Sequence, residues 1–315
     1  MDVPFHPPAV WLGFTALVVG LLALDLGVLN RRAHVLTMRE AAIWSASIVA
    51  IALSFGGFLW WREGSTVALE YYTGYLIELS LSVDNLFVFI LIFQYFGVPA
   101  ALQPRVLKWG IIGAIVMRAI MIGLGALLLE RFTWIIYVFG GILIFTGFKM
   151  FKGGHEEIEP EKNPVIRLAR RLIRVTQNYE GQSFLVKDPV GWHATPLLLV
   201  LLLVEWSDLV FAIDSIPAIF AVTRDPFIVY SSNIFAILGL RALFFVLAGA
   251  MDKFVHLKTG IAAILVFVGV KMVVSAWYHL PTTISLGVIV LFLATSIWAS
   301  MRHTPEEIEE SRGGE

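Results

Sequence analysis

Nine long apolar stretches dominate this sequence and decide which folds are open to it. Most have about 18–25 residues, the length with which an α-helix crosses the hydrocarbon core of a bilayer. They lie at 9–29, 41–61, 72–96, 109–129, 133–151, 195–221, 230–250, 259–278 and 284–301. With 58% hydrophobic and 15% charged residues, the composition is that of a membrane protein. The sequence therefore predicts an all-α polytopic membrane protein with about nine transmembrane helices.

The basic residues predict the orientation of these helices. Lys and Arg concentrate in the cytoplasmic loops of membrane proteins. If the nine helices alternate in direction, 17 basic residues lie on one side and only Arg62, Arg131 and Arg224 lie on the other. We therefore expect the N-terminus outside the cell membrane and the C-terminus in the cytoplasm.

Net charge and cysteine content exclude several functions. A net charge of −1 does not favour nucleic-acid binding. The chain has no cysteine, which excludes disulfides, thiolate metal sites and thiol catalysis. The apolar stretches hold no histidine at their centres and no pairing of a nucleophile with a base, so we do not expect an enzyme.

One loop, 152–194, is long enough for structure of its own. Asn163-Pro164 is a typical helix start, and Arg167, Arg170, Arg171 and Arg174 follow at helical spacing. Such a basic helix fits the anionic headgroups of membrane lipids, and a solvated linker helix fits the same pattern. A protein partner could also bind this cytoplasmic loop.

The sequence also repeats itself. MRAIMI (117–122) and GFKM (147–150) recur as LRALFF (240–245) and GVKM (269–272). Three helices per unit turn the second unit upside down relative to the first, as in transporters that bind their substrate near the midplane. We therefore expect a 3+3 inverted-repeat core. The predicted regions are two peripheral helices in 1–70, repeat 1 in 71–151, the loop 152–194, repeat 2 in 195–279, a last helix in 280–301 and an acidic tail in 302–315.

Carboxylates recur in the first helix of each unit. Glu78-x5-Asp84-Asn85 matches Asp208-x5-Asp214-Ser215. A carboxylate costs roughly 2.5–3.5 kcal/mol at the centre of a transmembrane helix, so such residues are expected to face an interior that uses them. The pattern predicts a cation site where the two helices meet. Its candidate ligands are Glu78, Asp84, Asn85, Glu205, Asp208 and Asp214.

Neighbouring residues could support this site. Ser82 shares a helix face with Glu78 and Asn85, at i, i+4 and i+7, and Ser215 ends the second motif. Pro217 frees a backbone carbonyl, so a kink there could add an oxygen ligand or be purely structural. Oxygen ligands favour Mn²⁺, Mg²⁺ or Ca²⁺ over Zn²⁺ or Cu, without selecting among the three.

Three further charged residues lie inside or near the apolar stretches. Arg118 and Arg241 each need an acidic partner, either as a counter-ion that the cation displaces or as a permanent helix–helix ion pair. Buried carboxylates also bind protons, so exchange of metal for H⁺ is a further expectation. Asp25 lies one turn from Arg31 and Arg32, where reaching toward the membrane surface is favoured over a role in the site.

Three segments carry a resemblance to a known family. TGYLIELSLSVDNLFVF (73–89), DSIPAIFAVTRDPFIVYSSNIFAILGLRALFF (214–245) and DLGVLNRRAH (25–34) resemble the TerC family of integral membrane proteins, and its Alx-type members in particular. The resemblance implies a bacterial inner-membrane protein, Mn²⁺ as the exported ion, and an association with tellurium resistance. It also implies that the acidic signature falls on the six candidate ligands named above.

Another class of function stays open. The protein could be a metalation or assembly factor that supplies Mn²⁺ to secreted or membrane proteins, with transport secondary. Deletion of residues 155–190 would then be more harmful than in a transporter. The direction of transport follows from the resemblance alone.

Overall fold

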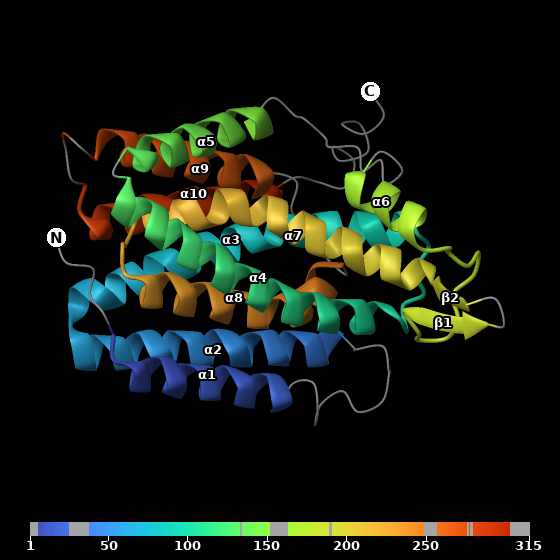
Figure 1. The fold of residues 1–315 in the computed structure, drawn as a ribbon. Coiled ribbons are helices and arrows are strands. Elements are labelled where there is room, and N and C mark those ends of the chain that lie inside the picture. Colours follow the sequence, from blue (N-terminus) through green and yellow to red (C-terminus); the bar gives the residue numbers. More distant parts are fainter. Residues whose placement is uncertain are drawn as a thin grey trace.

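The computed structural model describes residues 6–24, 38–132, 134–151, 163–188, 191–248, 257–275, 277 and 280–302. In these ranges the helices run alongside one another as a bundle, with a small hairpin at one end (Figure 1). The long helices are α1 (Pro8–Ala23), α2 (Met38–Glu63), α3 (Ser65–Tyr95), α4 (Gln103–Arg131), α5 (Ile135–Phe151), α7 (Pro196–Phe220), α8 (Pro226–Ala248), α9 (Leu257–Val274) and α10 (Thr282–Arg302). Each coincides with one of the apolar stretches.

The lengths of these helices bear on the number of membrane spans. Among the described residues, α2, α3, α4, α7, α8 and α10 are long and apolar enough to cross a membrane. The apolar helices α1, α5 and the part of α9 from Thr259 are shorter. The class of all-α polytopic membrane protein is thus confirmed, while the figure of nine transmembrane helices stays a prediction.

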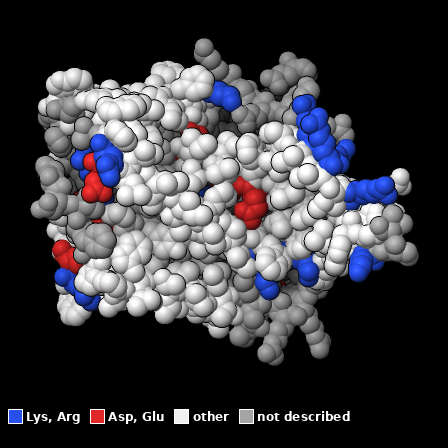
Figure 2. Space-filling view, viewed as in Figure 1, with Lys and Arg blue, Asp and Glu red and all other residues white. Residues whose placement is uncertain are grey.

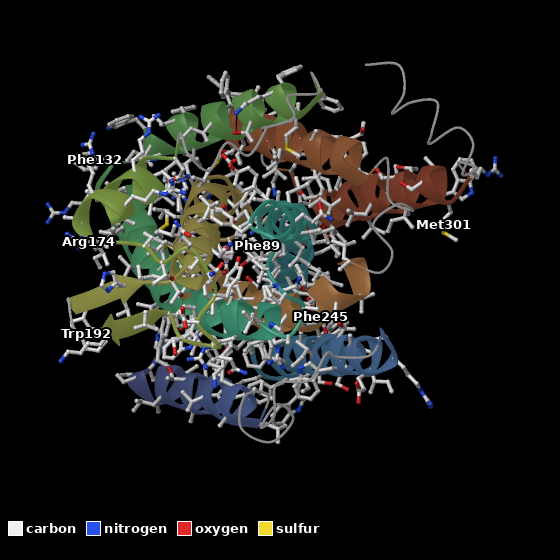
Figure 3. All side chains as sticks on the ribbon, turned by 90° about the vertical axis from the view of Figure 1, so that its right-hand side faces the viewer. Phe89, Phe132, Arg174, Trp192, Phe245 and Met301 are labelled. Carbon is white, nitrogen blue, oxygen red and sulfur yellow. The ribbon has the colours of Figure 1, made fainter. Side chains whose placement is uncertain are left out.

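Four helices form the centre of the bundle. Figure 1 shows α3, α4, α7 and α8 between α1 and α2 on one flank and α5, α9 and α10 on the other. From Phe227 to Ala242, every residue of α8 except Tyr230 is buried, which fits a central position in the bundle. The end-on view of Figure 3 places Phe89 of α3 in the middle of the bundle.

Helices α5 and α9 pack with their backbones in close approach. A Cβ atom on Gly140 would lie 3.0 Å from the Gly269 carbonyl oxygen, and one on Gly147 would lie 2.9 Å from that of Ala262. Small residues permit such approaches between helices in membranes. Because the contact partner moves backwards along α9 as α5 advances, the two helices run antiparallel.

The loop between α5 and α7 contains more structure than the sequence predicts. Helix α6 (Pro164–Leu172) begins where the Asn163 side chain accepts a hydrogen bond of 2.9 Å from the Val165 N–H, and Ile166 is buried. An antiparallel hairpin, β1 (Leu185–Asp188) and β2 (Gly191–Ala194), follows it and was not predicted. Arg174 lies beyond the end of α6.

This loop gives one end of the molecule its charge. Figure 2 shows Lys and Arg gathered at the end that carries α6 and the hairpin, while the flank of the bundle is almost free of charged residues. Figure 3 shows Arg174 and Trp192 at the rim of the molecule. Several residues with a predicted role lie outside the described residues: Asp25, residues 152–162, the tail after Arg302 and the side chain of Asp84, whose backbone belongs to α3.

Candidate cation site

An ion-pair cluster lies at the centre of the bundle, with Arg118 of α4 in its middle. The Arg118 side chain is fully buried, and its Nη1 donates to Glu78 Oε1 of α3. The same nitrogen donates to Ser215 Oγ of α7 at 3.0 Å and to Asn233 Oδ1 of α8 at 3.1 Å. One guanidinium group therefore holds together side chains from three other helices.

The second carboxylate of the cluster is Asp208 of α7. Arg118 donates to it from Nη2 at 3.1 Å and from Nε at 3.4 Å, the forked geometry that suits a guanidinium and a carboxylate. Asn85 Nδ2 of α3 donates to Asp208 Oδ1 at 3.4 Å. With both carboxylates ionised, the cluster carries one negative charge in excess.

Within the described part of the chain, three oxygen atoms on one face of α3 have no hydrogen-bond partner. Glu78 Oε2, Ser82 Oγ and Asn85 Oδ1 are buried, and none is hydrogen-bonded among the described residues. The orientation of the Asn85 amide follows from its chemistry, because Asp208 accepts and only the NH₂ group can donate to it. A buried acceptor without a partner costs about 1–3 kcal/mol, so three on one helix face call for a ligand.

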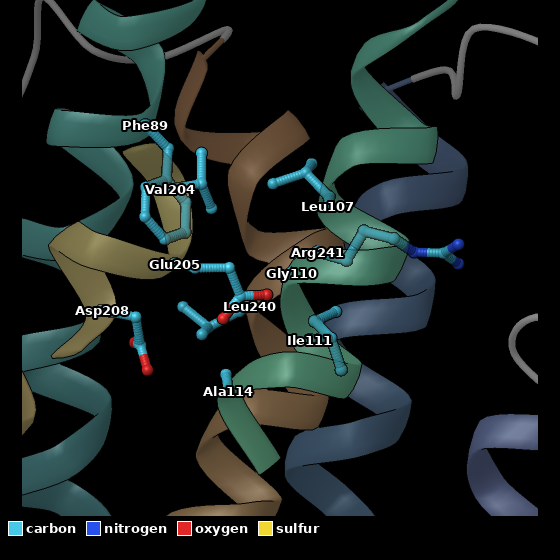
Figure 4. Close-up of a pocket in the computed structure, with 10 residues that line it drawn as sticks. All are labelled: Phe89, Leu107, Gly110, Ile111, Ala114, Val204, Glu205, Asp208, Leu240 and Arg241. Atoms are coloured by element: carbon cyan, nitrogen blue, oxygen red, sulfur yellow. The ribbon is translucent and has the colours of Figure 1, made fainter. Parts of the chain in front are cut away.

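Glu205 lies beside this cluster, in a pocket of its own. The pocket lies between α3, α4, α7 and α8, and Glu205, Asp208 and Arg241 contribute to its lining (Figure 4). The Glu205 carboxylate lies where a Cβ atom on Gly113 of α4 would be, so the glycine makes room for it. Figure 4 shows the Arg241 guanidinium pointing away from both carboxylates.

The second acid of the α7 motif lies elsewhere. Asp214 accepts a hydrogen bond of 3.0 Å from Thr146 Oγ1 of α5 and takes no part in the described contacts of Arg118. Among the described residues, no three His, Asp or Glu side chains come close enough together to hold a metal ion. The structure thus brings together Glu78, Asn85, Asp208, Ser215 and Arg118, with Glu205 nearby.

Two structural features add to what the sequence alone suggested. Asn233 was not among the candidate residues, although the run Ser231-Ser232-Asn233 inside an apolar stretch was a detectable signal. Helix α7 continues through Pro217 to Phe220, so Pro217 is accommodated without ending the helix.

A second cluster of ionisable side chains lies at the opposite end of the bundle from α6. His6 Nε2 lies 2.7 Å from Asp225 Oδ2, and His6 Nδ1 lies 3.9 Å from Glu63 Oε1. Glu70 is close to Thr223 and interacts electrostatically with Asp225. This group links the N-terminal segment to the start of α8 and does not contact Arg118.

Comparisons with known proteins assign the chain to a family. The profile of the integral membrane protein TerC family matches residues 63–307. A membrane protein of Myxococcus xanthus, named as uncharacterized, is 54% identical over 95% of this chain and 94% of its own. An Escherichia coli protein named "Putative membrane-bound redox modulator Alx" is 48% identical over 98% of both chains.

More distant matches agree with these. A membrane protein of Rickettsia felis is 43% identical over 92% of this chain and 97% of its own. No solved structure matches the chain. The matched region contains both acidic motifs and Arg118. The resemblance seen in the sequence is confirmed, and the chain belongs to the TerC family of integral membrane proteins.

Proposed function

We propose that this protein carries a divalent cation, most readily Mn²⁺, out of the cell through a site built on Glu78 and Asp208. The observation that carries the proposal is a set of three buried oxygens without hydrogen-bond partners among the described residues: Glu78 Oε2, Ser82 Oγ and Asn85 Oδ1. The carboxylate of Asp208 is buried beside them. Carboxylate, hydroxyl and amide oxygens are the ligands of hard divalent cations. Among these cations, Mn²⁺ follows from the resemblance to the Alx-type members.

The charges of the cluster suggest how such a site would work. Arg118 now supplies the positive charge between the two carboxylates. A divalent cation added beside it would leave a net positive charge buried, whereas a cation that displaces Arg118 leaves the site neutral. We therefore regard Arg118 as the internal substitute for the transported ion. Protons on the carboxylates would serve the same purpose, which makes H⁺ the exchange partner that we propose.

The contacts around Arg118 support an inverted repeat. Aligning the two motifs pairs Glu78 with Asp208 and Asn85 with Ser215. If each residue is replaced by its counterpart in the other unit, the contact of Asn85 with Asp208 becomes a contact of Ser215 with Glu78. Arg118 Nη1 donates to both Ser215 and Glu78 and so holds these two side chains together. The acidic helices α3 and α7 therefore meet in an arrangement that two inverted units would generate.

The contacts between α5 and α9 also map onto each other when each residue is replaced by its counterpart in the other unit. Alignment of GFKM with GVKM pairs Gly147 with Gly269 and Gly140 with Ala262. The contact of Gly147 with Ala262 then becomes the contact of Gly269 with Gly140, and both occur. Transporters of this architecture alternate access around a midplane site.

A metalation or assembly role is the second candidate. The observation that favours it is the basic platform of α6 and the hairpin at one end of the bundle, which could bind a partner (Figure 2). The word redox in the names of several relatives does not point to thiol chemistry in this chain, because the chain contains no cysteine.

Reconstituted transport separates these roles. The purified protein in liposomes is expected to give saturable Mn²⁺ flux, which Mg²⁺ and Ca²⁺ reduce according to selectivity. Glu78→Gln and Asp208→Asn should lower it by about tenfold or more, and Glu180→Gln, an exposed loop position, should not. Absence of flux from the wild-type protein under every imposed pH gradient would remove the transport proposal.

A further inference from the structure

The two arginines of the repeat occupy unlike places in this structure. Arg118 lies between Glu78 and Asp208 and contacts both. Arg241, at the matching position of the second unit, is 3% exposed and lines the pocket beside Glu205. Its guanidinium points away from Glu205 and Asp208 (Figure 4). The sequence repeat treats the two residues as equivalent, whereas the structure does not.

The two carboxylates that hold Arg118 replace each other when the two units are exchanged. Glu78 and Asp208 are counterparts, and so are Asn85 and Ser215. Arg241 would therefore meet the same two carboxylates if it approached the cluster from its own side, with Asn85 in the place of Ser215. It would lack a counterpart of Asn233, because Gly110 occupies that position in the first unit.

The free space around the cluster also differs between its two sides, with a pocket on the α4 side and tight packing on the α8 side. The pocket opens on the side of the cluster formed by the first half of α4, where Gly110 and Ile111 line it. On the matching side, formed by the first half of α8, the helices are packed tightly. A Cβ atom on Gly74 would lie 3.1 Å from Ser232 Oγ and 3.2 Å from a methyl group of Ile219.

We propose that Arg241 replaces Arg118 between Glu78 and Asp208 in a second conformation, in which the pocket is closed and the α8 side is open. The two arginines thereby alternate as counter-ions of one acid pair, and the cation occupies the pair between their visits. The inference rests on the inverted repeat of the proposed function and adds Arg241 as a residue of the same site. It also explains why each unit keeps a buried arginine, since an unpaired buried acid pair is unfavourable in either conformation.

Thiol labelling tests this exchange directly, because the chain has no cysteine to remove. Ile111→Cys and Ile234→Cys form a matched pair, each seven residues before its arginine, with 5% and 0% exposure. In detergent-purified protein, the thiol at 111 should react faster than the thiol at 234 with a water-soluble maleimide. Arg118→Ala should raise the rate at 234 by about tenfold and lower the rate at 111, because it removes the counter-ion of the present conformation only.

The double variant supplies the decisive comparison. Adding Arg241→Ala to Arg118→Ala should bring the rate at 234 back toward its original value, because both conformations then lack their arginine. Arg118→Lys and Arg241→Lys retain the charge and serve as controls. If Arg118→Ala does not elute as folded protein, Arg118→Gln, which keeps a hydrogen-bonding group, takes its place.

Two results would overturn the inference. In one, both thiols react faster in the Arg118 variant, which indicates general loosening. In the other, Arg241→Ala leaves the rate at 234 unchanged in that background. Labelling does not require transport, so reciprocal labelling without Mn²⁺ flux would keep the exchange of arginines and remove cation transport. Mn²⁺ flux without reciprocal labelling would keep cation transport and remove the exchange of arginines.

Discussion

Asp208 and Asp214 lie six residues apart on α7, yet their surroundings differ. Asp208 is 2% exposed and receives hydrogen bonds from a guanidinium group and an amide, so its charge is compensated. Asp214 is half-buried and accepts from the neutral hydroxyl of Thr146. The first acid belongs to a buried ion-pair cluster, and the second lies at the contact between α7 and α5.

Helix geometry explains this difference. Six residues of an α-helix turn through about 600°, so the second side chain is displaced by about 120° from the first. The two acids of α7 therefore leave the helix in different directions, which fits their separate partners in this structure. In this structure the first acids of the two motifs, Glu78 and Asp208, meet in the central cluster, whereas Asp214 lies against α5.

The largest effect is expected from removing Arg118, the counter-ion that Asp208 shares with Glu78. Arg118→Ala leaves Glu78 and Asp208 buried without a counter-ion, which should lower the free energy of unfolding by about 3–5 kcal/mol. The midpoint of thermal unfolding in detergent measures the loss. If Arg118 substitutes for the transported ion, Mn²⁺ should raise the midpoint of this variant more than that of the wild type.

A conservative change controls for this variant. Arg118→Lys keeps the positive charge but loses the fork that holds both oxygens of Asp208, so its loss should be smaller. Equal stability of Arg118→Ala and the wild type, without metal, would mean that the carboxylates of the cluster are not charged.

The next largest effect is a difference in Mn²⁺ flux between variants of Asp208 and of Asp214. Asp208→Asn should lower the rate of Mn²⁺ flux in liposomes by about tenfold or more, because it removes a charged ligand worth over 1.4 kcal/mol. Asp214→Asn keeps a group that can accept from Thr146 and should leave most of the flux. Equal loss in both variants would return Asp214 to the transport site.

Much of the fold follows from the sequence. The positions of the long helices follow from apolar length, and the helix start at Asn163 follows from its capping side chain. The hairpin after α6 does not, because its strands are only four residues long and lack a clear alternating pattern. Short strands depend on pairing that a local pattern does not reveal.

The central site is predictable in part. Helical spacing placed Glu78, Ser82 and Asn85 on one face, and the repeat paired Glu78 with Asp208. The contribution of Asn233 and the separation of Asp214 depend on how α8 and α5 are rotated against α7. That rotation is set by packing between segments that are distant in the sequence, and the local spacing of residues does not reveal it.

A smaller effect is expected at Ser82. Its hydroxyl is buried without a partner among the described residues, so Ser82→Ala should leave the midpoint of unfolding unchanged or raise it. If the hydroxyl binds the cation, the Mn²⁺ concentration for half-maximal flux should rise by about fivefold, which corresponds to about 1 kcal/mol. A lower midpoint with unchanged Mn²⁺ dependence would instead assign Ser82 a structural role.

The smallest effect is expected at the contact of the second acid. Thr146→Val preserves the shape of the side chain and removes the donor to Asp214, at a cost of about 0.5–1.5 kcal/mol in the free energy of unfolding. Because Asp214 lies outside the cluster of Arg118, Mn²⁺ flux should stay close to that of the wild type. Thr146→Ser retains the hydroxyl and controls for the change in the side chain. A large loss of flux in the valine variant alone would show that the hydrogen bond from α5 holds Asp214 for the transport cycle, and that the two acids of α7 act together.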